Sequence, residues 1–319
     1  MRQYIFRRFL QSIPTLLMLT LITFGFMQLA PGDFVDAMID PAALTSNSEQ
    51  VLAQQRAALG LDQPVVIQYV NWLGQLVQGN MGYSFVYRRP VLAMIRERLW
   101  GTLQLGGAAI IVAIIVGVSA GVVSGLRPYS KFDYIVSVFS YGAWSFPNFY
   151  LGLILIYIFA VQLKILPSAG MLTPGVDDLG DRLKHLILPV TALCVQFIGQ
   201  FARQTRSAVL EVRGQDYVTT ARAKGLRTQR ITLRHILPNA LIPIITVIGL
   251  SLPILITGAI VTEMVFSWSG MGILMINAIT ARDYPVVMGT VLVIGMVVLG
   301  VNLVVDMLYA VVDPRIRYQ

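Results

Sequence analysis

The side chains that could carry out chemistry in this chain are few and scattered. The single cysteine, Cys194, lies inside an apolar run with no histidine or acid beside it, and the two histidines, His185 and His235, stand at the edges of apolar stretches. The chain has no glycine-rich nucleotide loop, no HExxH motif and no recognisable Ser/His/Asp set. Glu263 follows an apolar stretch immediately, and Asp306 could line a pathway or pair near the membrane interface. The sequence therefore predicts no enzyme, no metal site and no buried proton relay.

The densest charge lies in one segment, residues 203–234, which has eight Arg/Lys and two acids. Within it we expect a helix of about two turns, roughly 12 Å long, with Asp216 as its N-cap and Gly225 as its left-handed C-terminal stop. One interpretation is a solvated basic loop held by anionic lipid headgroups. The other is a helix that another protein grips.

Composition indicates an integral membrane protein. Hydrophobic residues make up 56% of the 319 residues, charged residues only 13%, and the mean hydropathy is +0.70. A soluble domain carries about a quarter of its residues as charges. We therefore expect the chain to be embedded in the lipid bilayer and to bind no nucleic acid.

Six apolar segments are long enough to cross a bilayer, which takes about 20 residues. They predict an all-α polytopic membrane protein with six transmembrane helices and a long external loop between the first two. The first segment resembles a signal peptide, but its length and Gln28 near the end favour a retained helix. The six predicted spans are Phe9–Ala30, Thr102–Leu126, Tyr134–Val161, Leu186–Gln204, Ala240–Thr262 and Pro285–Val312.

The distribution of Lys and Arg predicts the orientation. Placing the N-terminus inside gives the inner segments fifteen of the basic residues and the outer segments nine, five of these in the long outer segment, where charge weighs less. We therefore expect both termini in the cytoplasm and the segment 31–98 outside. The predicted parts are an N-terminal span (1–30), an external helical region (31–98), a five-helix core (99–312) with the basic loop at 203–238, and a tail (313–319).

The external region carries its own helix signals. Ser46-Asn47-Ser48-Glu49 forms a capping box before a helix that Gly60 can end, and apolar residues repeat at helical spacing between Val65 and Val77. The second helix could rest on the membrane through its aromatic face, or it could be a docking platform for an external partner.

The predicted spans contain small residues and helix interruptions. Glycines at every fourth position on one face of the second span permit close approach of another helix. Breaks in a span are tolerated where protein or a water-filled cavity satisfies the backbone. The residues concerned are Gly117, Gly121, Gly125, the pair Pro147-Asn148, Pro243 and Pro253.

The order and spacing of several short motifs resemble one known family. The basic segment Glu211–Leu226, continued by His235–Asn239, is similar to the cytoplasmic coupling motif of permease subunits in binding-protein-dependent ABC importers. Thr219, Thr220 and Ala221 stand where the general motif has Glu-Ala-Ala, which is similar to the peptide branch. Further matching motifs are Ala30-Pro31-Gly32-Asp33, Leu59-Gly60-Leu61-Asp62-Gln63-Pro64, Gly270-Met271-Gly272 and Asp313-Pro314-Arg315-Ile316-Arg317.

The whole chain resembles the first of the two permeases in the dipeptide, oligopeptide and nickel branch. That resemblance implies the type I importer permease fold, a bacterial inner-membrane location, a second permease as heterodimer partner, two ATP-binding cassette subunits and an external solute-binding protein. It also implies that ATP and Mg are bound by the partners, with no cofactor bound by this chain. The residues implied in coupling are Asp216, Tyr217, Thr220, Ala221, Arg222, Ala223, Lys224, Gly225 and Leu226.

A secondary transporter or channel acting alone is the competing hypothesis. It would predict buried acids near the midplane and often an internal repeat, and the sequence has neither. The solute stays open among dipeptides, oligopeptides, nickel complexes and oligosaccharides.

Overall fold

The computed structural model describes residues 2–29, 60, 62–84 and 86–312, and within these ranges its regular structure is helical. This confirms the predicted all-α class. In chain order the helices are α1 (Arg2–Leu29), α4 (Val65–Val77), α5 (Val91–Ala113), η2 (Ile114–Val118), α6 (Ser119–Leu126), α7 (Lys131–Ser145), α8 (Asn148–Leu155), η3 (Ile156–Gln162), α9 (Leu179–Arg213), α10 (Asp216–Ala223), α11 (Thr228–Ile231), η4 (Thr232–Ile236), α12 (Leu237–Val265), α13 (Met271–Thr280) and α14 (Tyr284–Val312).

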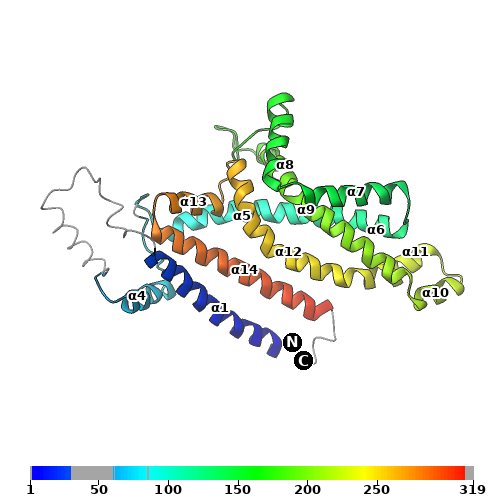
Figure 1. Ribbon diagram of the computed structural model, residues 1–319, viewed down its shortest axis with the longest axis horizontal. Helices are drawn as coiled ribbons and strands as arrows, with labels where there is room; N and C mark the ends of the chain where they lie inside the picture. The colour runs from blue at the N-terminus through cyan, green and yellow to red at the C-terminus, as the bar shows by residue number, and fades with distance from the viewer. Residues whose placement is uncertain (1, 30–59, 61, 85, 313–319) are drawn as a thin grey trace.

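Five helices are long and apolar enough to cross a membrane, and a sixth crossing is a bent pair. The predicted third span, Tyr134–Val161, is not one straight helix, because α7 and the continuous α8–η3 segment meet at an angle of 104°. Phe146 has an extended backbone (φ −104°, ψ 130°), the conformation that a following proline favours. Pro147 therefore ends α7, and α8 turns away from the helices around it (Figure 1).

The other prolines do not break their helix. We predicted interruptions at Pro243 and Pro253, yet α12 runs through both without a gap. A proline removes one backbone donor but fits a helix whose neighbours compensate, as membrane helices often allow. The break at Pro147 and the continuity of α12 show that the presence of a proline alone does not determine a break.

Helix α9 lies at the centre of the bundle, with α5, α6, α7 and α12 packed around it. The predicted glycine face of the second span contacts it directly. A Cβ on Gly117 would lie 2.8 Å from the Ile198 carbonyl oxygen, and one on Gly121 would lie 2.5 Å from that of Ala202. The two backbones approach so closely only because these positions have no side chain.

The two ends of the bundle differ in what they hold. The start of α1 and the end of α14 lie at the same end as α10 and α11, and α4 and α13 lie at the opposite end (Figure 1). Helix α4 begins and ends where the periodic residues predicted it, at Val65 and Val77. The predicted capping box, Ser46–Glu49, lies outside the described residues.

Candidate functional site

The helix expected in the basic segment is present as α10. It follows α9 after a two-residue connection, and its N-cap is Gln215 rather than the predicted Asp216. Gln215 has an extended backbone (φ −73°, ψ 148°), and its carbonyl oxygen accepts hydrogen bonds from the amides of Val218 and Thr219. Asp216 is instead the first helical residue, where its carboxylate stabilises the N-terminal end of the helix dipole.

The other end of α10 confirms the predicted role of Gly225. Its φ is +72°, and its amide donates to the Arg222 carbonyl at 2.9 Å. The amide of Leu226 reaches back to the Ala221 carbonyl at 3.4 Å, which completes a Schellman motif. Gly214, at the other end of α10, has an ordinary helical φ of −82°.

The inner side of α10 is anchored to the bundle by apolar side chains. Val218 is fully buried and Ala221 is 5% exposed. Both belong to a cluster with α9, α11, η4 and α12, and Leu226 packs against its edge. The remaining buried members of this cluster are Ala208, Val209, Ile231, Ile236, Ala240 and Ile244.

The outer side of α10 is polar and exposed. Of the nine residues predicted for coupling, seven are exposed, Leu226 is half-buried and Ala221 is buried. Ala221 therefore holds the helix to the bundle, together with Val218, which was not among the predicted residues. The spacing of three between these two apolar residues is the sequence signal for that inner face. The seven exposed residues are Asp216, Tyr217, Thr220, Arg222, Ala223, Lys224 and Gly225.

Three of the eight basic residues belong to α9 rather than to a loop. The helix continues to Arg213, and no glycine or proline lies between Gly199 and Gly214 to end it sooner. Arg203 lies over the ring of Tyr141 at 5.8 Å from its centroid, and Arg213 donates to the Leu126 carbonyl at 3.1 Å. These side chains are engaged with the protein, which corrects the expectation of one continuous basic loop from 203 to 234.

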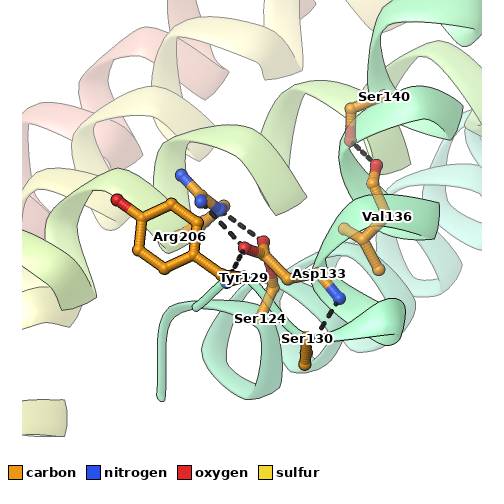
Figure 2. Close-up of polar contacts among 7 residues, drawn as sticks. All are labelled: Ser124, Tyr129, Ser130, Asp133, Val136, Ser140 and Arg206. Atoms are coloured by element: carbon orange, nitrogen blue, oxygen red, sulfur yellow. Dashed lines mark hydrogen bonds and ion pairs between the residues drawn. The ribbon is translucent and has the colours of Figure 1, made fainter. Parts of the chain in front are cut away.

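Arg206 forms the strongest of these contacts. Figure 2 shows its guanidinium facing Asp133 of α7, with Nε to Oδ1 at 2.5 Å and Nη2 to Oδ2 at 2.9 Å. Ser124 of α6 and the backbone amide of Tyr129 also donate to this carboxylate. Asp133 is only 3% exposed. The Asp133 carboxylate therefore connects α6, α7 and α9, in the C-terminal part of α9 that leads into α10.

The other two acids, Asp306 and Glu263, have partners on helices far away in the sequence. Asp306 pairs with Arg8 of α1, with Nε to Oδ2 at 3.3 Å, so the pairing alternative is the one observed. Glu263 is fully buried, and it accepts from the Thr102 hydroxyl at 2.5 Å and from the Gly272 amide at 2.7 Å. Within the described residues no group of three or more His, Cys, Asp or Glu side chains could hold a metal ion.

Comparison with known protein families gives two adjoining matches. Residues 113–318 match the family described as binding-protein-dependent transport system inner membrane component. Residues 1–106 match the N-terminal part described for the same kind of membrane component. Together they cover the N-terminal region and all helices from η2 onward.

Individual relatives match over the full length. The chain is 42% identical over 320 residues to the oligopeptide transport system permease protein AppB of Bacillus subtilis, with all of both chains covered. It is 41% identical over 338 residues to the di/tripeptide transport system permease protein DppB of Pseudomonas aeruginosa, again with both covered completely. A solved structure of the inward-facing MetNI methionine ABC transporter shares the fold, with a TM-score of 0.54 and 21% identity, over 69% of this chain and 96% of that one.

Proposed function

The chain belongs to the family of binding-protein-dependent transport system inner membrane components and is a permease subunit of an ABC importer, and we propose that it carries peptides. The names of its relatives support peptides as the solute, since the oligopeptide and di/tripeptide permeases match over their whole length. The chain forms half of the translocation pathway, and a second permease subunit forms the other half. An external solute-binding protein delivers the peptide.

Helix α10 is the proposed contact with an ATP-binding cassette subunit. The observation that carries this assignment is its two-sided construction, with buried Val218 and Ala221 on one side and exposed polar residues on the other. A partner that grips the exposed side would move α9 and α12 with it, because the buried side belongs to the same apolar cluster as those helices. Coupling of this kind needs a rigid connection and no reactive group.

ATP hydrolysis is assigned to two partner subunits, which would bind ATP and Mg. This chain contributes no catalytic residue in this proposal. The start of α1 and the end of α14 share one end of the bundle with α10 (Figure 1), which supports placing both termini in the cytoplasm of a bacterial cell. Helices α4 and α13 then lie on the external side of the inner membrane.

The test is peptide uptake into proteoliposomes that contain the two permeases and the ATPase subunits, with the external binding protein added. Each component is omitted in turn, and a proton ionophore is added in a parallel series. We expect uptake to require every component and ATP, and to persist with the ionophore. Uptake by this chain alone, or loss of uptake with the ionophore at constant ATP, would identify a secondary transporter instead.

A further inference from the structure

Helix α4 has one apolar face that packs within the chain. Tyr69 and Trp72 lie against Phe24 of α1, with ring centroids 5.4 Å and 5.9 Å from the Phe24 centroid. The hydroxyl groups of Tyr69 and Thr20 are 2.9 Å apart. The aromatic residues, which the sequence had suggested for contact with the membrane, are thus used to attach α4 to α1.

A second apolar face of α4 is exposed. Val65 is 53% exposed, Val66 72%, Val70 58% and Val77 82%, and no residue of this helix is fully buried. At 100° per residue, Val66, Val70 and Val77 lie side by side next to the face that contacts α1. Exposed apolar residues gathered on one face of a helix mark an interaction surface.

The chain around this face has no charge. From Gln63 to Tyr87 there is no Asp, Glu, Lys or Arg. The polar residues of this segment are uncharged amides such as Gln68, Gln75 and Gln78, so no charge has to be desolvated where the helix meets lipid.

The depth of α4 beside α1 identifies the occupant. Thr20, which contacts Tyr69, lies roughly two and a half helical turns inside the Leu29 end of the apolar span Phe6–Leu29. The surface of α1 beside Thr20 is also apolar and exposed, with Leu17 at 43% and Leu21 at 55%. Acyl chains that surround α1 at this level therefore continue onto α4, where a soluble protein could not reach.

We propose that α4 is an interfacial membrane helix whose valine face (Val66, Val70 and Val77) is buried in the lipid of the external leaflet. The aromatic residues Tyr69 and Trp72 attach it to α1, and the valine face extends the lipid-contacting surface of that helix. The occupant is lipid, and neither the external binding protein nor a second permease covers this face. The choice of the external leaflet rests on the proposed topology, whereas the contact with lipid does not depend on it.

Spin labels in the assembled importer test this proposal. Single cysteines replace Val70 or Gln75 in a Cys194→Ala background, and the complex is placed in nanodiscs of phosphatidylethanolamine and phosphatidylglycerol. Collision of the nitroxide with oxygen, which concentrates in lipid, is compared with collision with a water-soluble nickel chelate. Gln75 is the matched control, because it is exposed on the opposite, polar side of the same helix.

For Val70→Cys we expect oxygen accessibility to exceed that of the nickel chelate, and for Gln75→Cys we expect the ratio to reverse. High nickel accessibility at position 70 that falls when the external binding protein is added would overturn the proposal in favour of a docking surface. Low accessibility to both reagents would show that protein covers the face, which also overturns it. Val77→Cys, at the most exposed of the valines, gives the same readout if the Val70 variant fails to assemble. Peptide transport by these variants is measured separately, so failure of the lipid contact is distinguishable from failure of the proposed function.

Discussion

At the scale of single residues, Gly214 and Gly225 flank the same short helix but serve it differently. Gly225 has a φ of +72°, whereas Gly214 has a φ of −82° that any residue adopts. The positive φ lets the amides of Gly225 and Leu226 satisfy the last carbonyls of α10. Of these two glycines, only Gly225 therefore sets the direction in which the chain leaves α10.

Replacement of Gly225 by valine should therefore impair transport without preventing insertion. A left-handed φ costs a residue with a Cβ roughly 1–2 kcal/mol, and the strain would fall on the end of α10. We expect peptide uptake and peptide-stimulated ATPase activity of the reconstituted importer to fall together. Gly214→Val is the matched control and should retain both, so equal activity in the two variants would contradict this role for Gly225.

The contact between Asp133 and Arg206 shows what a sequence does not reveal at this scale. The role of Gly225 follows from chemistry local to the helix end, and it was predictable. Asp133 and Arg206 are far apart in the chain and meet only because α7 packs on α9. Val218 was missed for the same reason, since its burial depends on residues of α9 and α12.

Removing one partner of this pair should destabilise the protein more than removing both charges. Arg206→Met leaves the carboxylate of Asp133, which is only 3% exposed, without its counter-ion. Breaking a buried ion pair in this way lowers the free energy of unfolding by roughly 3 kcal/mol or more. We expect a lower midpoint of thermal unfolding in detergent, partly restored in the Asp133→Asn, Arg206→Met double variant. The surface pair Arg89–Glu97 is the control, and Glu97→Gln should leave the midpoint nearly unchanged. If the double variant were less stable than Arg206→Met, the pair would not be the source of the loss.

At the scale of elements, the sequence predicted which helices exist better than it predicted their course. Apolar length located the spans, because burying a helix in lipid requires about 20 apolar residues wherever the helix then packs. The break at Pro147-Asn148 was predicted, but its angle of 104° was not predictable, since it depends on where α8 docks. Gly152 of α8 lies against the ring of Phe266, and Gln196 of α9 donates to the Phe146 carbonyl at the break. These contacts come from distant parts of the chain and set the direction.

The glycine face between α6 and α9 should tolerate no added side chain. A Cβ on Gly121 would lie 2.5 Å from the Ala202 carbonyl oxygen and 2.5 Å from the Thr205 Cβ. Gly121→Ala should therefore force the helices apart at a cost of about 1–3 kcal/mol. Gly107→Ala on α5, where a Cβ meets nothing within 4 Å, should keep or slightly raise stability. Thermal unfolding of the two variants in detergent distinguishes them, and an equal response would mean that the helices have room to separate.

At the scale of the whole molecule, one long helix, α9, connects the α10 end of the bundle with the loop that precedes it. Helix α9 leads into α10 at its C-terminal end and begins after the loop at residues 163–178. A motion of α10 can therefore be transmitted through this continuous helix to the opposite end of the bundle. The exposed basic residues of the α10–η4 segment, such as Arg222, Arg227 and Arg234, lie at the end where α1 begins and α14 ends (Figure 1). The charge pattern that predicted the orientation thus coincides with a common end of the bundle. Which side of the membrane that end faces is the remaining prediction.

We expect the α10 end to face the cytoplasm and the loop before α9 to face outward. Thr228, at the start of α11, and Asp177, in that loop, are both exposed and lie in segments that the topology places on opposite sides. Each is replaced by cysteine in a Cys194→Ala background, and intact cells are treated with a membrane-impermeant thiol reagent. Asp177→Cys should react in intact cells, whereas Thr228→Cys should react only after permeabilisation, because the positive-inside bias holds the basic segment in the cytoplasm. Reaction of Thr228→Cys from outside would invert the topology and place α10 beyond the reach of any cytoplasmic ATPase.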